Sequence, residues 1–143
     1  MTTAEYQRKH FWALMEKELK EQGEPFSIRP QYSGNSVRHY ASIMKGEGVN
    51  LDVNFLTQDG ILRICLYIHN RPELYEFLKE KREVIENILG FSVAFSVGEK
   101  NKDVKWVKRE WGFVPFDSDD YTRALKEALA DMIKFVKAFK AFL

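Results

Sequence analysis

Two strand-like segments joined by a tight turn near the middle of the chain constrain the fold most strongly. From Val49 to Thr57, apolar and polar residues alternate, which is typical of an antiparallel strand with one buried face and one face in water. The triplet Gln58-Asp59-Gly60 then predicts a hairpin turn, because glycine adopts the positive φ that such turns need. The segment Ile61 to His69 is rich in β-branched and aromatic residues, so we expect it at the centre of a sheet.

Three helices are expected around this hairpin. A capping-box pattern at residues 2–5 predicts a helix from Thr3 to about Gln22. The same pattern at residues 70–73, followed by apolar residues three to four apart, predicts a second helix that ends at Gly90. Acidic residues at positions 117–120 begin the third helix, where the helix dipole favours negative charge.

Further strands are expected on both sides of the hairpin. Val37 to Met44 has the least regular strand pattern, and a short strand is an option at Phe26 to Arg29. Phe91 to Val97 and Val104 to Trp111 predict a second hairpin around the charged turn Gly98 to Asp103.

The resulting order of elements is α-β(β)ββ-α-ββ-α. Because it lacks the strict alternation of strand and helix that a parallel sheet requires, it predicts an α+β fold. We expect a mostly antiparallel sheet of five or six strands, with three helices packed on one side. A length of 143 residues with 45% hydrophobic and 30% charged residues is typical of one compact domain. We therefore expect a single α+β domain over residues 1–143.

The charge balance limits the classes of partner. The chain has 22 basic and 21 acidic residues and a formal net charge of +1, which argues against a strongly basic nucleic-acid binder but leaves local charge clusters open. No run of about 18 apolar residues is present to span a bilayer, and Met1 to Lys9 has no apolar stretch of a signal peptide. The single cysteine, Cys65, lies in an apolar run and is expected to be buried and inert. These features predict a soluble, cytoplasmic protein without membrane contacts.

Motifs for cofactors and metals are missing from the sequence. The three histidines, His10, His39 and His69, lack the spacing of a helical or hairpin metal pair. The glycines at positions 46 and 48 lie between two strands rather than before a helix, which favours a hairpin loop over a phosphate-binding loop. We therefore predict neither a metal site nor a cofactor.

A metal-dependent nuclease nevertheless stays open as an alternative, since such enzymes place acids on adjacent strands with a lysine nearby. The weak candidates are Asp52 on the wet face of its strand, Asp103 with Lys105 on a later strand, and His69 as a base. The strand before Asp103 carries no acid to complete a metal pair. An enzyme is therefore the less favoured interpretation, and we expect Asp52 to face solvent or support a turn.

The second hairpin carries the strongest functional pattern. Aromatic rings beside cationic side chains are one arrangement that holds single-stranded nucleic acid. The candidate nucleic-acid-binding residues are Lys100, Lys102, Lys105, Trp106, Lys108, Arg109 and Trp111. The competing interpretation, which we favour, is that one tryptophan packs in the core while the lysines solvate an edge strand.

Two other kinds of partner follow from the apolar residues. The last helix is apolar over more than one face near its end, at Ile133, Phe135, Val136, Phe139, Phe142 and Leu143. A monomer would have difficulty covering all of these side chains, so we consider a homodimer formed through this helix. A small-molecule ligand is a further hypothesis, because Tyr40, Tyr67 and Trp106 could line an aromatic pocket.

Several segments together resemble a bacterial and archaeal family, the domain of unknown function 4268. They are Phe11-Trp12, the hairpin Leu51-Asp52-Val53-Asn54 to Leu66-Tyr67-Ile68, and the helix Lys81 to Gly90. Members of that family occur alone or after a restriction-endonuclease-like domain of the PD-(D/E)XK type. The resemblance therefore implies an accessory role near nucleic-acid processing or defence, and it transfers no catalytic residue.

Three hypotheses follow from the sequence. The first is a non-catalytic binding module that self-associates or holds a nucleic acid or a protein. The alternatives are a degenerate or unrecognised metal-dependent nuclease and a small-ligand-binding domain.

Overall fold

The computed structural model describes residues 3–21, 32–33, 36–37, 40–56, 61–112 and 121–142, with side chains at 5–21, 47–55, 61–112 and 123–142. Within these residues the chain forms four helices and seven strands, so the α+β class is confirmed. In chain order the elements are α1 (Thr3–Glu21), β1 (Tyr32–Ser33), β2 (Ser36–Val37), β3 (Tyr40–Gly46), β4 (Val49–Leu56), β5 (Ile61–His69), α2 (Pro72–Glu80), α3 (Arg82–Leu89), β6 (Ala94–Val97), β7 (Val104–Gly112) and α4 (Tyr121–Phe142).

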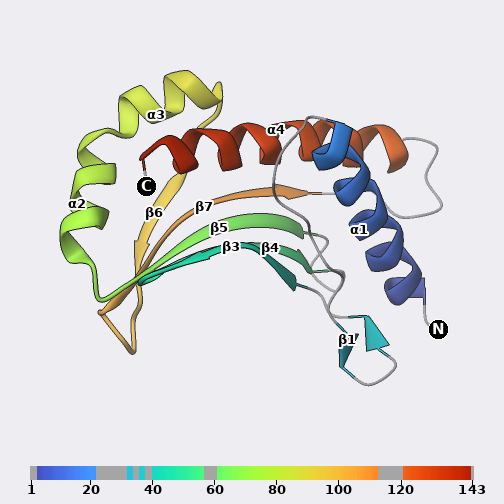
Figure 1. Ribbon diagram of the computed structural model, residues 1–143, viewed down its shortest axis with the longest axis horizontal. Helices are drawn as coiled ribbons and strands as arrows, with labels where there is room; N and C mark the ends of the chain where they lie inside the picture. Colours follow the sequence, from blue (N-terminus) through green and yellow to red (C-terminus); the bar gives the residue numbers. More distant parts are fainter. Residues whose placement is uncertain are drawn as a thin grey trace.

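The last five strands form one antiparallel sheet in the order β3-β4-β5-β7-β6, and β1 and β2 form a separate two-stranded ribbon. The main sheet does not follow chain order (Figure 1). Helices α2 and α3 carry the chain from β5 to the edge of the sheet, where β6 begins, and β7 then returns between β6 and β5. The expected antiparallel pairing is confirmed, although the strands lie in two sheets instead of one.

All four helices pack against one face of the main sheet (Figure 1). Alternate residues of β4 and β5 point to this face and are buried there: Val49, Leu51, Val53, Phe55, Leu62, Ile64, Leu66 and Ile68. The rings of Phe11 on α1 and Phe55 on β4 lie 5.0 Å apart. Removing each such side chain from water stabilises the fold by roughly 1.5–3 kcal/mol, so this interface is the core of the domain.

The opposite face of the sheet bears the remaining alternate residues. We call it the open sheet face and define it by Asn50, Asp52, Asn54, Arg63, Cys65, Tyr67, Trp106, Lys108 and Glu110. None of the described helices lies over it (Figure 1). The polar residues that alternate along Val49–Leu56 therefore lie on the face that the sequence pattern assigned to water.

The helix expected between Asn70 and Gly90 is divided in two at Lys81. Leu74 and Leu78 of α2 are buried in the core, and an uninterrupted helix would bring Lys81 and Arg82 onto the same stripe. Lys81 leaves the helical conformation, with φ −89° and ψ 10°. The turn keeps both cationic side chains in water, and the chain therefore has four described helices where three were expected.

Other expected boundaries also changed. The described residues of the expected strand Val37–Met44 belong to two strands in different sheets, since Val37 ends β2 and Tyr40 begins β3. The strand expected from Phe91 begins only at Ala94. The option of a strand at Phe26–Arg29, the Gln58–Gly60 turn and the acidic helix start at 117–120 lie outside the described residues.

Candidate binding surface on the open sheet face

Alternation along β7 divides the predicted basic and aromatic hairpin between two faces of the sheet. Trp106 and Lys108 point to the open sheet face, because they pair with Tyr67 and Cys65 of β5. The side chains that point to the helices are those of Lys105, Arg109 and Trp111. Lys100 and Lys102 lie exposed in the turn between β6 and β7. The structure therefore does not bring the seven predicted residues together as one surface.

Tyr67 and Trp106 are the aromatic centre of the open sheet face. They are direct partners on β5 and β7, and their ring centroids lie 6.1 Å apart with the planes inclined by 60°. Both side chains are half-buried. Burial raises the pKa of the Tyr67 hydroxyl, and the neighbouring Cys65 raises it further. The hydroxyl therefore stays neutral at physiological pH.

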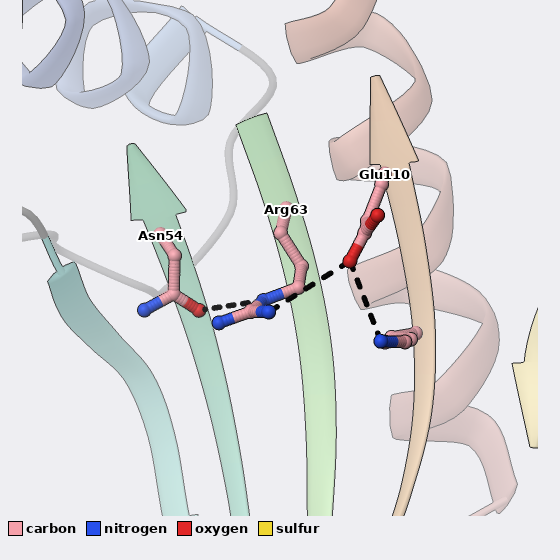
Figure 2. A network of polar contacts seen from close by, with 4 residues as sticks. Asn54, Arg63 and Glu110 are labelled. Atoms are coloured by element: carbon pink, nitrogen blue, oxygen red, sulfur yellow. Dashed lines mark hydrogen bonds and ion pairs between the residues drawn. The ribbon is translucent and has the colours of Figure 1, made fainter. Parts of the chain in front are cut away.

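A polar network crosses three strands beside this aromatic pair (Figure 2). Arg63 donates from Nε to Oδ1 of Asn54 at 3.4 Å. Its Nη1 lies 3.7 Å from Oε1 of Glu110, and Nζ of Lys108 lies 3.4 Å from the same oxygen. Two cations thus share one carboxylate, and Figure 2 shows the network on the side of the sheet away from α4.

Cys65 lies on β5 between the aromatic pair and the polar network. It pairs with Asp52 of β4 on one side and with Lys108 of β7 on the other. Its thiol is buried, and that burial raises its pKa to about 12. Because the thiolate is the nucleophilic and metal-binding form, this cysteine is chemically inert at neutral pH.

A cleft of about 640 Å³ adjoins Trp106 at the end of the β6–β7 hairpin. Its lining includes Ser96, Val97 and Lys100. Val97 is 43% exposed, although it is a large apolar side chain. Val97 pairs with Lys105 on the helix side of the sheet, whereas Ser96 pairs with Trp106, so the cleft beside Trp106 reaches around the end of the hairpin.

Asp52 lies apart from the other three nuclease candidates, which meet at one end of β5 and β7, where His69 pairs with Val104, between Asp103 and Lys105. Asp52 is in the middle of β4, whereas His69 ends β5 and is exposed. Asp103 lies in the hairpin turn, and Lys105 lies on the opposite face from Asp52, with its Nζ 5.3 Å from the ring centre of Tyr75. Among the described residues, no three His, Cys, Asp or Glu side chains are grouped to hold a metal ion.

The small-ligand hypothesis is met only in part. Tyr67 and Trp106 do lie together, but the side chain of Tyr40 is outside the described set. Tyr40 pairs through its backbone with Asn54, which lies four residue pairs along β4 from Asn50, the partner of Tyr67. Sequence reasoning named both aromatic residues of the pair, and it missed Arg63, Asn54 and Glu110 beside them.

The apolar end of α4 is covered within the chain. Ile133, Phe135, Val136 and Phe139 are buried, because α4 packs between the sheet, α1 and α3. Phe142 is half-buried against Phe77 of α2, with ring centroids 6.4 Å apart, and Leu143 lies outside the described residues. Four of the six side chains thus belong to the core of one chain, so they give no support to a dimer through this helix.

Membrane insertion of a helix has no support in the described part of the chain. None of its helices is both long enough and apolar enough to cross a bilayer.

The profile of one protein family, described as a domain of unknown function (DUF4268), matches residues 7–143. The chain belongs to the DUF4268 family. The resemblance seen in the sequence is thereby confirmed over nearly the whole chain. No curated protein matches the sequence.

Three solved structures show a distant likeness to this DUF4268 chain. The putative transcription regulator YbjN from E. coli is 11% identical, with a TM-score of 0.42, and the match covers 87% of this chain and 86% of that one. The ExsC–ExsE complex gives 12% identity, a TM-score of 0.41, and coverage of 85% and 89%. The HopA1–SchA chaperone–effector complex gives 7%, 0.43, and coverage of 84% and 91%. Similarity at this level carries no information about what this chain binds.

Proposed function

We propose that this DUF4268 chain is a non-catalytic module that binds a protein partner through its open sheet face. The observation that carries the proposal is the pairing of Tyr67 with Trp106 on a face that no described helix covers. Protein interfaces characteristically have tyrosine, tryptophan and arginine at their centre and polar groups around them. The open sheet face has this composition, with Arg63 and Asn54 in the adjoining network.

The distribution of charge favours a protein over a nucleic acid. Single-stranded nucleic acid is held by unpaired cations that follow the phosphates beside the stacking rings. On the open sheet face Arg63 and Lys108 already share Glu110. The remaining cations of β7 point to the other face. The cleft beside Trp106 adds one cation, Lys100, and one acid, Glu99, so its lining carries no net positive charge for a phosphate backbone.

The family resemblance adds a hypothesis about context. Relatives fused to restriction-endonuclease-like domains suggest an accessory role beside nucleic-acid-processing enzymes, so such an enzyme is a partner worth testing. In that hypothesis the nuclease chemistry belongs to the partner. This chain contributes recognition, because Asp52 lies four residue pairs along the sheet from His69, and Lys105 points to the opposite face.

The test is to select binders from a displayed library of random peptides and to map the tightest one by nuclear magnetic resonance. We expect the Trp106 indole signal and the backbone signals of β5 and β7 near Tyr67 to move on binding. The indole signal of Trp12, which is fully buried, is the internal control and should stay in place. Binders that move only signals on the outer surfaces of the helices would contradict the proposal.

A further inference from the structure

Strand β7 is longer than its neighbour β6. It pairs with β5 along its whole length, from Val104 to Gly112, whereas β6 pairs only with residues 105–108. Beyond Lys108, the edge of β7 that points away from β5 therefore has no strand partner among the described residues. Such an edge presents unpaired backbone groups to an approaching chain.

The hairpin shows which backbone groups point to this free edge. Gly98 donates its N–H to the carbonyl of Val104 at 2.8 Å, so the even-numbered residues of β7 direct their backbone groups toward β6. Glu110 and Gly112 continue this series past the end of β6. No backbone group in the described part of the chain bonds to them on that side. Among the described residues, the backbone groups of Glu110 and Gly112 on this side therefore have no backbone partner, and they are the groups that an added strand would pair with.

A cleft of about 370 Å³ opens at the same place. Ser92 and Val93, in the segment that leads into β6, line one side, and Arg109 and Glu110 of β7 line the other. We call it the β7 edge cleft. It lies where the β6 ladder stops, so the cleft opens at the first residue of the free backbone edge, Glu110.

Arg109 is the cation of the β7 edge cleft that has no acidic partner. Its guanidinium lies over the rings of Phe91 and Trp111, at 5.4 and 5.7 Å from their centres. These rings hold the planar group in a defined orientation. No ion pair of Arg109 exists with any described residue, and its Nε is buried without an acceptor.

The other two cations at the cleft are already neutralised. Nε of Arg82 lies 2.6 Å from Oε1 of Glu86, and Nζ of Lys108 lies 3.4 Å from Glu110. Arg109 is thus the cation whose donors remain for a ligand. A carboxylate matches the guanidinium fork, because its two oxygens accept parallel hydrogen bonds.

We propose that the β7 edge cleft binds an acidic, extended peptide segment of a partner protein. The segment adds a short strand to β7 at Glu110 and Gly112 and places an aspartate or glutamate carboxylate on Arg109. The free edge selects an extended backbone, and the unpaired guanidinium selects the acidic side chain. The inference rests on the proposed function only in taking the partner to be a protein, and its site is separate from the open sheet face.

The side-chain half of the proposal is tested with two fluorescein-labelled peptides of alternating threonine and valine. One has a central glutamate and the other a central glutamine. In anisotropy titrations we expect the full chain to bind the glutamate peptide about tenfold more tightly, as a charge-assisted hydrogen bond implies. Arg109→Gln should abolish the difference, and Lys100→Gln, in the exposed turn, should preserve it. Equal affinity of the wild-type chain for both peptides would overturn the proposal.

The backbone half is tested at Gly112. Gly112→Pro removes the N–H that points to the free edge and leaves the bonds to β5 intact, whereas Gly112→Ala retains this N–H. A Cβ at Gly112 meets nothing within 4 Å, so the alanine variant is a matched control. We expect only the proline variant to weaken both peptides, with circular dichroism confirming that both variants fold. Equal affinities of the two variants would overturn strand addition.

A further variant tests whether the peptide binds at the β7 edge cleft or at the open sheet face. Trp106→Ala should leave the affinity for the glutamate peptide unchanged, because Trp106 points to the other face of β7. Loss of peptide binding in this variant would assign the peptide to the open sheet face and overturn the β7 edge cleft as its site.

Discussion

Trp106 and Tyr67 face each other across β7 and β5, with ring centroids 6.1 Å apart. The chain between them passes through α2, α3 and β6, so the pair exists only because the fold places β7 next to β5. Such pairs contribute about 0.5–1.5 kcal/mol beyond the area they bury. Both rings remain half-buried, which leaves aromatic surface for a partner.

Glu110 pairs with both Arg63 and Lys108, and together with Asp52 it balances the two positive charges of the open sheet face. We expect Glu110→Gln to bind single-stranded RNA more tightly than the wild-type chain does. The logarithm of its affinity should fall with the logarithm of salt concentration with a slope up to about −1.4, the value for two phosphates. Anisotropy of a labelled oligonucleotide at several salt concentrations measures this slope.

The matched control for that experiment is Glu127→Gln, which removes an exposed acid from α4 and changes the net charge equally. Its RNA affinity should equal that of the wild-type chain. Tight, salt-sensitive binding by the wild-type chain itself would contradict our account of the surface and support a nucleic-acid module.

Cys65 should resist thiol reagents in the folded chain. Burial raises its pKa to about 12, so at about pH 8 the thiol is protonated and unreactive. We expect Ellman's reagent to react only as fast as the chain unfolds, and within the mixing time once urea is added. Rapid reaction of the native protein would show that this thiol is accessible and ionised.

The same pKa shift predicts a loss of stability in alkali. The ordinary pKa of the thiol is 9.0 and its folded value is about 12. Between these values the unfolded chain releases a proton that the folded chain retains, so the free energy of unfolding falls as pH rises. Urea titrations should show this fall above about pH 9, and Cys65→Ala should show a shallower one. A slope unchanged by the substitution would contradict the assignment to Cys65.

Phe139 of α4 tests whether the apolar end of that helix is core or interface. Phe139 is fully buried, and its ring centre lies 4.4 Å from that of Phe135. We expect Phe139→Ala to lower the free energy of unfolding by about 3–5 kcal/mol. Lys134→Ala, on the exposed side of the helix, should change it little. A fall in sedimentation mass without any loss of stability would instead support a dimer through α4.

Local patterns predicted the elements that depend on local physics. The alternation along β4 identified both its buried and its polar face, because a half-buried strand requires a period of two. The strand β5, Ile61–His69, was predicted with the bounds that the structure shows. The first helix was predicted to within one residue of α1, which ends at Glu21.

The candidate surface depended on information that is not local. Lys105, Lys108 and Arg109 are close in sequence, and the hairpin was first interpreted as one patch. The period of two that revealed β4 also separates Lys108 from the other two residues, so the signal was present along β7. The partnership of Trp106 with Tyr67 depends on strand order, and no local pattern specifies which strand becomes the neighbour of β5.

In the last helix, tertiary packing explains an apolar pattern that the sequence of the helix alone could not explain. Phe135 lies beside the main apolar stripe of α4 and suggested a surface that one chain could not cover. The helix is instead enclosed by the sheet, α1 and α3, so a wide apolar face is what its position requires. The same tertiary constraint divides α2 from α3 at Lys81.

The most direct test of the central claim is the dissociation constant of a selected peptide binder for the wild-type chain, Trp106→Ala and Tyr6→Ala. Tyr6 is the matched control, because it is 55% exposed on α1, away from the open sheet face. Our account predicts that Trp106→Ala weakens binding roughly thirtyfold, as the loss of about 2 kcal/mol at an interface centre implies, and that Tyr6→Ala leaves it unchanged. Equal affinities for all three proteins would contradict a protein-binding role of the open sheet face.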